Sequence, residues 1–572
     1  MPEFGFSRWR TWLKQSDGLF TLVLLGVVTG IATSAVMALF LSTLDAVLHL
    51  LNGESLEDFE SLSAAMRFAL PVVGSLLLIL LFRFTPNHVQ TVGVAHVLDR
   101  LRRGRGRLPA GNAIFQFVAA LIALGSGHSV GKEGPAVHIG AGIANQLGQA
   151  THRVPSQLRL LTGCGTAAAI SSAFDTPLAG VLFAMEVVLM EYSLLGFTPI
   201  IASAVTAAVT TRWFMGEHPA FVTDPFSVGG LADLPALLLT GLMIGLFAVV
   251  FHRLVRTFLR MRVHARALRL LLAGVIAGAL ALVVPQILGS GFDTVNAALA
   301  NELGWTALLV ILVAKIVATA AAIGLGVPAG LIGPTLVMGA CAGGVIGALM
   351  PGAADPAFYA LLGMAAMMSA VLHAPLAALA AVLELSLNAH AMFPAMVVVL
   401  GANLVCQHAF KQPSLFRALL EAQGLTIETH PVRIALSQRF LSELASSQFD
   451  RLDLTLDEDR IGKVLKGPYR WVMIQIENDS YLLSKPVLNE FYVDWVQLNA
   501  DTRRPLGDAL RQAVPPYSRL VQLDGDITLL GAVKLLKRED TAGFMLPLDD
   551  DRVGLVTRGQ LVSVLTSEGD IH

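Results

Sequence analysis

Five consecutive residues, Gly131-Lys132-Glu133-Gly134-Pro135, open a long apolar segment. A helix that begins here presents backbone N–H groups without intrahelical partners, and its dipole places partial positive charge at the same end, so the segment suits an anion. Gly131 and Gly134 let the backbone approach that ion without a Cβ in the way. The carboxylate of Glu133 would itself occupy an anion site and leave it on protonation, which predicts a gate. A simple helix cap, or a place at the membrane surface, is the alternative role for Glu133.

A second segment, Gly330-Leu331-Ile332-Gly333-Pro334, repeats the glycine and proline scaffold without the acid. The repeat extends well beyond it. Gly131, Pro135 and Gly140 match Gly330, Pro334 and Gly339 at an offset of 199 residues, and Pro177 and Glu186 match Pro375 and Glu384 at 198. Anchors at so constant an offset indicate a duplicated unit, near 19–214 and 231–409. The sequence leaves open whether the halves run parallel or inverted.

The composition predicts where this unit lies. Hydrophobic residues make up 54% of the 572 positions, and 38 of the 82 charged residues fall in 431–572. The first 430 positions are therefore too apolar for a soluble enzyme and read as a membrane body followed by a water-soluble tail. The net charge of −2 gives no indication of nucleic acid binding.

Long apolar runs supply the helices that must position the two glycine segments. Runs of spanning length are 19–42, 65–83, 234–252, 268–288, 306–324 and 391–408. Shorter pieces broken by glycine or proline lie at 108–126, 133–148, 159–172, 176–191, 328–349, 358–371 and 375–387. Helices broken inside a membrane are typical of ion sites. Arginine-rich loops near 100–107 and 253–269 are expected to face the cytoplasm, with an RNA- or lipid-binding patch as the alternative, and 1–18 is expected to form an amphipathic lead-in.

The blocks GKEGP, FDTPLAGVLFAMEV and VPAGLIGP resemble, in order and spacing, the signatures of the CLC family of chloride channels and proton/chloride antiporters. The resemblance covers about 19–566. It implies an α-helical polytopic membrane fold over 19–425, with inverted halves and broken helices. It also implies a homodimer with one pore per subunit in the plasma or inner membrane, and a cytoplasmic pair of α/β CBS-like domains at 431–572.

The resemblance also assigns roles to single residues. Glu133 matches the family's external gating glutamate. Chloride or a similar small anion is expected to meet Thr91, Val92, Gly131, Lys132, Gly134, Gly330, Leu331, Ile332 and Phe416.

Three of these positions depart from the family pattern. Val92, next to Thr91, aligns with an anion-coordinating serine, Phe416 with a pore-lining tyrosine, and Ile332 with a phenylalanine. Two hydroxyl donors are therefore missing. A lost hydrogen bond to a charged group costs about 1.5–3 kcal/mol, so weak chloride binding is expected.

Val187 stands where antiporter members carry an internal proton-accepting glutamate, while Glu186 matches a neighbouring structural acid. One step along a helix turns a side chain by about 100°, so Glu186 should not replace the missing group. This difference favours a passive, voltage-gated anion channel over a proton-coupled antiporter. An embedded sensor or enzyme is a remote third hypothesis, because the apolar body shows no acid/base pair or activated nucleophile.

The tail pattern from Asp524 predicts helix, strand, strand, helix with Thr528 as N-cap, and a rougher copy precedes it near 458–484. Gln560 stands where nucleotide-binding CBS units usually carry an aspartate, so adenine nucleotide binding is not expected. No other cofactor is predicted. Neither the three cysteines nor the dispersed histidines show metal-ligand spacing, so no metal site is expected; those histidines are His96, His128, His138 and His373.

Overall fold

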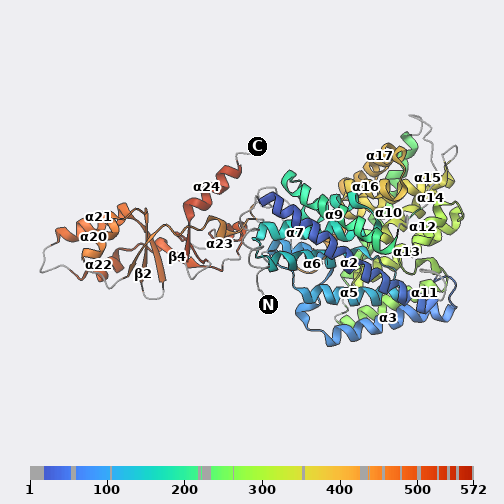
Figure 1. Cartoon of the computed structure of the whole chain (residues 1–572), viewed down its shortest axis with the longest axis horizontal. Helices are drawn as coiled ribbons and strands as arrows, with labels where there is room; N and C mark the ends of the chain where they lie inside the picture. The colour runs from blue at the N-terminus through green and yellow to red at the C-terminus, as the bar shows by residue number, and fades with distance from the viewer. Residues whose placement is uncertain are drawn as a thin grey trace, which may run out of the picture. The chain divides into compact units, whose positions relative to one another are not determined.

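The computed structural model divides into two compact units, Met1–Ile427 and Glu428–His572. It describes residues 18–52, 59–103, 106–216, 221, 234–261, 263, 265–350, 355–425, 436, 439–453, 458–476, 479–498, 504–524, 527–536, 541–548 and 553–569. All but the last residue of the lead-in expected at 1–18 lies outside them. In Figure 1 the first unit, coloured from blue to yellow, is helical, and the second, in orange and red, contains the strands.

The helices of the first half are α2 (Gly18–Asn52), α3 (Ala64–Phe84), α4 (Gly93–Arg103), α5 (Ala110–Gly125), α6 (Glu133–Ala150), α7 (Pro155–Phe174), α8 (Pro177–Phe183) with the π-turn η2 (Ala184–Leu189), and α9 (Leu194–Met215). Those of the second half are α10 (Leu234–Leu259), α11 (Arg266–Ala281), α12 (Phe292–Leu299), α13 (Trp305–Leu325), α14 (Ile332–Leu349), α15 (Pro356–Leu372), α16 (Pro375–Ser386), α17 (Met392–Asn403) with the π-turn η6 (Leu404–Ala409), and α18 (Leu415–Ala422). Short 3₁₀ turns are η1 (Asn87–Val89), η4 (Pro285–Ile287) and η5 (Ala389–Ala391).

Among the described residues, six helices are long and apolar enough to cross a membrane. Five overlap the spans expected from the sequence. The sixth is Ile332–Leu349, and the span expected at 268–288 is instead the shorter α11, which ends at Ala281. Pro285 follows shortly after that end and keeps the helix from resuming, because proline disfavours helical geometry in the preceding residue; Val284 accordingly has φ −133° and ψ 81°.

Two carboxylates tie the halves together reciprocally. Glu384, on α16, accepts hydrogen bonds from the first N–H groups of α8, those of Leu178 and Ala179, at 2.8 Å each. Glu186, following α8, accepts from Leu376 and Ala377 at the start of α16, at 3.2 and 2.9 Å. Each acid lies late in its own segment and meets the beginning of the other, so the segments run antiparallel. This antiparallel relation is the one expected of inverted halves.

The second unit contains a single six-stranded sheet in the order β1-β2-β3-β4-β5-β6. Its strands are β1 (Asp450–Asp453), β2 (Trp471–Ile476), β3 (Asp479–Ser484), β4 (Arg519–Gln522), β5 (Gly543–Pro547) and β6 (Val553–Thr557). Its helices are α20 (Glu458–Lys466), α21 (Lys485–Gln497), α22 (Leu506–Ala513), α23 (Leu529–Leu536) and α24 (Arg558–Gly569), with 3₁₀ turns η7 (Leu441–Leu444) and η9 (Pro516–Ser518).

The same unit occurs twice in this tail. The order strand, helix, strand, strand, helix holds for β1-α20-β2-β3-α21 and again for β4-α23-β5-β6-α24. In both copies the first two strands pair in parallel and the last two antiparallel. As predicted, Thr528 caps the helix that follows it, since its Oγ1 accepts from Gly531 N–H at 3.2 Å. The tail is therefore a duplicated βαββα region.

The carboxylate caps yield a test of how the halves are held. Changing Glu384 to leucine removes the acceptor of two N–H groups, and hydrogen bonds to a charged group contribute about 1.5–3 kcal/mol. We expect Glu384→Leu to lower the apparent midpoint of thermal unfolding in detergent, whereas Glu302→Leu at an exposed position should not. Equal midpoints in the two variants would contradict this role.

Candidate functional site

The two glycine segments meet through their backbones. Gly131 N–H donates to Gly330 O at 2.8 Å, and Gly330 N–H donates back to Gly131 O at 2.7 Å. The contact leaves no room for side chains, since a Cβ on Gly134 would lie 2.8 Å from the Gly330 Cα. The helices that follow, α6 and α14, therefore bring their N-terminal ends to one point. Two sets of helix N-terminal N–H groups converging in this way form a site for negative charge.

The side chain of Glu133 fills this point. The residue is fully buried, so its carboxylate lies inside the protein. A Cβ on Gly333 would lie 2.8 Å from its Oε1, and one on Gly330 would lie 2.9 Å from its Oε2. A Cβ on Gly131 would overlap Oε2. Three glycines thus shape a cradle for the carboxylate, against the first turn of α14 as well as its own helix.

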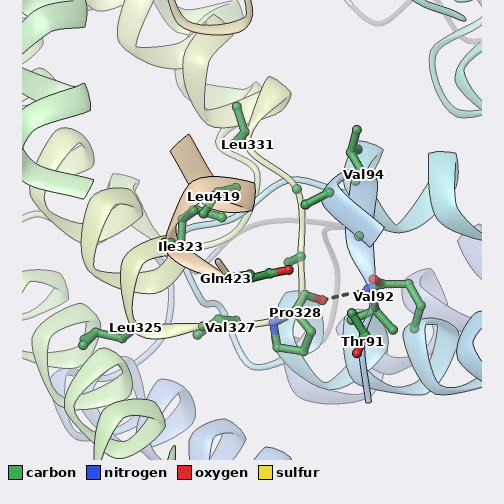
Figure 2. Close-up of a pocket in the computed structure, with 18 of the residues that line it drawn as sticks. Thr91, Val92, Val94, Ile323, Leu325, Val327, Pro328, Leu331, Leu419 and Gln423 are labelled. Carbon is green, nitrogen blue, oxygen red and sulfur yellow. Dashed lines mark hydrogen bonds between the residues drawn. The ribbon is translucent and has the colours of Figure 1, made fainter. Parts of the chain in front are cut away.

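A cavity of about 710 Å³ leads to the same glycines. Of the predicted anion contacts, its lining includes Thr91, Val92, Gly134, Gly330, Leu331 and Phe416. Figure 2 shows three of the stretches that line it: the blue segment with Thr91, Val92 and Val94, the yellow-green stretch from Ile323 near the end of α13 to Leu331, and the end of α18 with Leu419 and the following Gln423. The structure therefore brings six of the predicted residues, distant in sequence, around one space.

The remaining predicted contacts lie elsewhere. Gly131 forms the backbone bridge. Ile332, the first residue of α14, lines a separate apolar cavity of about 20 Å³ together with Phe183. Lys132 turns its ammonium toward aromatic rings, with Nζ 5.4 Å from the Phe174 centroid and 5.5 Å from that of Phe292. Its charge is thus held over two rings near the cradle rather than in the cavity lining.

The next residues are apolar ones that stand where the family pattern has polar side chains. Val92 and Phe416 line the cavity, and the Phe416 ring meets Phe183 edge-on, with centroids 6.5 Å apart. Val187 is buried in η2, and the neighbouring Glu186 points to the start of α16. The prediction that Glu186 does not substitute for Val187 agrees with this orientation.

Sequence reasoning missed four residues of the site. Gly333 touches the Glu133 carboxylate, and Gln116, fully buried on α5, donates to Pro328 O at 2.9 Å and lines the cavity. A polar residue inside an apolar run was the available signal for Gln116. Arg266 and Arg269 also line the cavity; the sequence pointed to their loop only as a marker of orientation. Arg269 donates to Gly324 O at 2.8 Å.

Within the described ranges, no group of three or more His, Cys, Asp or Glu side chains is arranged to hold a metal ion. The site combines backbone N–H groups and the buried Glu133 carboxylate with a cavity whose lining includes two arginines and several uncharged polar side chains. Such an arrangement suits negative charge.

Comparison with known proteins identifies the family. Residues 73–407 match the family described as voltage gated chloride channel, and the chain belongs to this CLC family. A ClcB-like chloride channel protein of Ralstonia nicotianae is 34% identical over 64% of this chain and 88% of its own length. A protein of Yersinia pestis named H(+)/Cl(-) exchange transporter ClcA is 31% identical over 53% of this chain and 67% of its own.

Solved structures agree on the fold. A eukaryotic CLC transporter superposes with a TM-score of 0.62 at 20% identity, covering 95% of this chain and 99% of that one. A slow cyanobacterial Cl⁻/H⁺ antiporter gives 0.60 at 21%, and a CLC-type fluoride/proton antiporter gives 0.58 at 24%, each covering 70% of this chain and 97% of the other. The membrane unit thus has the CLC transporter fold.

The buried carboxylate yields a second prediction. Because the carboxamide of Glu133→Gln mimics the protonated acid, this variant should raise anion flux and abolish its acid dependence. Chloride efflux from vesicles at neutral and acidic pH measures both effects. Glu302→Gln, at an exposed position, should retain the wild-type pH dependence, and slow, still acid-activated efflux from Glu133→Gln would refute the gate.

The missing hydroxyls yield a third prediction. In a Glu133→Gln background, where no carboxylate competes, chloride should bind weakly. Val92→Ser and Phe416→Tyr should each tighten it by about tenfold or more, since a hydrogen bond to a charged group contributes about 1.5–3 kcal/mol. Calorimetric titration tests this, and equal affinities in all three proteins would show that neither side chain reaches the anion.

Proposed function

We propose that this protein is a proton-coupled antiporter of chloride or a similar small anion. The observation that carries the proposal is the Glu133 carboxylate within its cradle of glycines. A carboxylate and an anion cannot share this place. Because protonation removes the charge that the cradle stabilises, proton binding at Glu133 and anion binding at the glycines become linked events.

The cavity supports the anion as substrate. Arg266 and Arg269 lie in its lining, and their positive charge raises the local concentration of anions in a space with low-dielectric walls. The Arg266 guanidinium lies 4.8 Å from the Phe82 ring centroid and donates to Gln90 Oε1, so its position is fixed. At the inner end, the glycine segments and the nearby helix ends offer N–H donors.

Relatives support coupling to protons. Similar proteins are named H(+)/Cl(-) exchange transporters, and two structures that share the fold are those of proton antiporters. The passive channel predicted from the sequence becomes the second candidate. Its support is one position, the buried Val187, which can neither bind nor release a proton.

The deciding experiment uses the purified chain in liposomes with an imposed chloride gradient. An antiporter drives protons against the direction of chloride movement until a protonophore is added, and Glu133→Gln should abolish this proton movement while chloride still flows. A channel moves chloride alone. Chloride flux from the wild-type chain without coupled proton movement would therefore contradict the antiporter and favour the passive channel.

We propose a homodimer in the plasma or inner membrane with a cytoplasmic tail, and we assign the duplicated βαββα region to a CBS-like pair because its strand order repeats as two such units would. Voltage dependence follows from Glu133 only if its charge moves within the membrane field. Gln560 Oε1 accepts from Thr557 N–H at 2.8 Å and caps its own helix, which supports a tail without adenine nucleotide.

A further inference from the structure

Two buried carboxamides lie one turn apart on α5. Asn112 retains 1% of its exposure and Gln116 none, and because they are four residues apart they lie on the same face of the helix. Among the described residues, neither Asn112 Oδ1 nor Gln116 Oε1 has a hydrogen-bond partner. Both nitrogens, in contrast, are bound to main-chain carbonyl oxygens. What each amide contributes here is therefore its N–H donors.

Asn112 holds one wall of the cavity of about 710 Å³. Its Nδ2 donates to Thr91 O and Val89 O at 2.9 Å each and to His88 O at 3.2 Å. Three carbonyl oxygens around one end of the side chain identify that end as the nitrogen. Thr91 and the next residue, Val92, line the cavity. A single amide thus fixes the segment that leads into α4.

Gln116 holds a second wall, which belongs to the other half of the chain. Its Nε2 donates to Pro328 O at 2.9 Å (the dashed line at Pro328 in Figure 2). Pro328 and Gly330 line the cavity, as does Gln116 itself. Gly330 also makes the backbone bridge to Gly131. The bond therefore ties α5 to the loop that carries one of the two bridged glycines.

These bonds decide which way the peptide groups of the walls point. In a trans peptide the C=O of one residue and the N–H of the next point in opposite directions. Because the Thr91 C=O is held against α5, the N–H of Val92 points away from that helix. An anion needs donors around it, and a carbonyl oxygen offers only an acceptor. A carbonyl released from its amide would be free to turn its negative end toward the anion.

We propose that Asn112 and Gln116 are positioning residues for the transported anion. They hold the segment before α4 and the loop before α14 at a fixed separation, with the bound carbonyl oxygens turned toward α5, and so set the affinity and the size preference of the cavity. Walls fixed in advance favour the small anion that fits them, because binding then spends no free energy on ordering them. The inference rests on the proposed anion site, and it holds for an antiporter and a channel alike.

The test replaces each amide by an apolar side chain of similar shape, in Asn112→Leu and Gln116→Met. Two amides of α6 give matched controls, Asn145→Leu and Gln146→Met. Both bind the backbone of Leu108: Asn145 Oδ1 accepts from its N–H at 2.8 Å, and Gln146 Nε2 donates to its carbonyl oxygen at 2.6 Å. Neither control is among the described residues that line the cavity.

Anion uptake into liposomes, measured against anion concentration, gives the KM and the maximal flux for chloride and for the larger iodide. We expect Asn112→Leu and Gln116→Met each to raise the KM for chloride at least fivefold, while the maximal flux changes less than twofold. The KM for iodide should rise less, so the preference for chloride falls at least threefold. The controls should lower the midpoint of thermal unfolding as much as the cavity variants do, yet keep the wild-type KM and preference.

Other outcomes contradict the positioning role. An unchanged KM in both cavity variants, a fall in maximal flux alone, or an equal rise of KM in the controls would show that the amides only stabilise the fold. If one cavity variant does not fold, the other decides alone; if neither folds while both controls do, the amides are needed for folding and the positioning role fails. A wild-type chain that moves no anion would contradict the proposed function itself, and no variant is needed to see it.

Discussion

The close approach of two glycine backbones is the constraint on which the site depends. Gly131 and Gly330 exchange hydrogen bonds of 2.8 and 2.7 Å, and the neighbouring Gly134 comes so near Gly330 that no side chain fits between them. This contact places the first N–H groups of α6 and α14 around one point. Their partial positive charges add there, because no water screens them. An isolated helix N-terminus at a surface attracts an anion weakly. Two of them closed over a buried carboxylate create a position where a negative charge is stable and where two negative charges cannot coexist.

The two halves of the membrane unit also stabilise each other reciprocally around that contact. Glu186 and Glu384 each satisfy the N–H groups that begin the helix of the opposite half. These donors have no intrahelical partners, and leaving such groups unmet inside a membrane costs several kcal/mol. Since each half provides the acid that the other half needs, neither half is complete alone. The acids beside the pore are therefore of two kinds: a structural pair fixed by backbone donors, and Glu133, held against glycines where it can be exchanged for an anion.

The sequence could predict those features that rest on local pattern. The GKEGP block, the constant offset of the repeat and the apolar runs indicated the helix starts at Glu133 and Ile332 and the duplicated body, because glycine, proline and hydrophobic periodicity act over short distances. The repeat alone could not predict the antiparallel relation of α8 and α16, and nothing in the sequence indicated the turn of Lys132 onto Phe174 and Phe292 or the part that Gly333 plays in the cradle. These depend on which distant segments meet. The His96–His138 contact is of the same kind: in sequence the two histidines are 42 positions apart and were interpreted as dispersed, and only the packing of α4 on α6 joins them.

The apolar lining and the Glu133 carboxylate differ in how they respond to protons. With Val92 and Phe416 in place of hydroxyl donors, the cavity lining offers an anion fewer side-chain donors, so stabilisation falls mainly on backbone N–H groups that cannot titrate. Apolar walls also exclude water, which strengthens the attraction between those N–H groups and whichever negative charge is present. The anion path is then insensitive to protons except at Glu133. A proton and an anion therefore compete at that one carboxylate, as the proposed exchange requires.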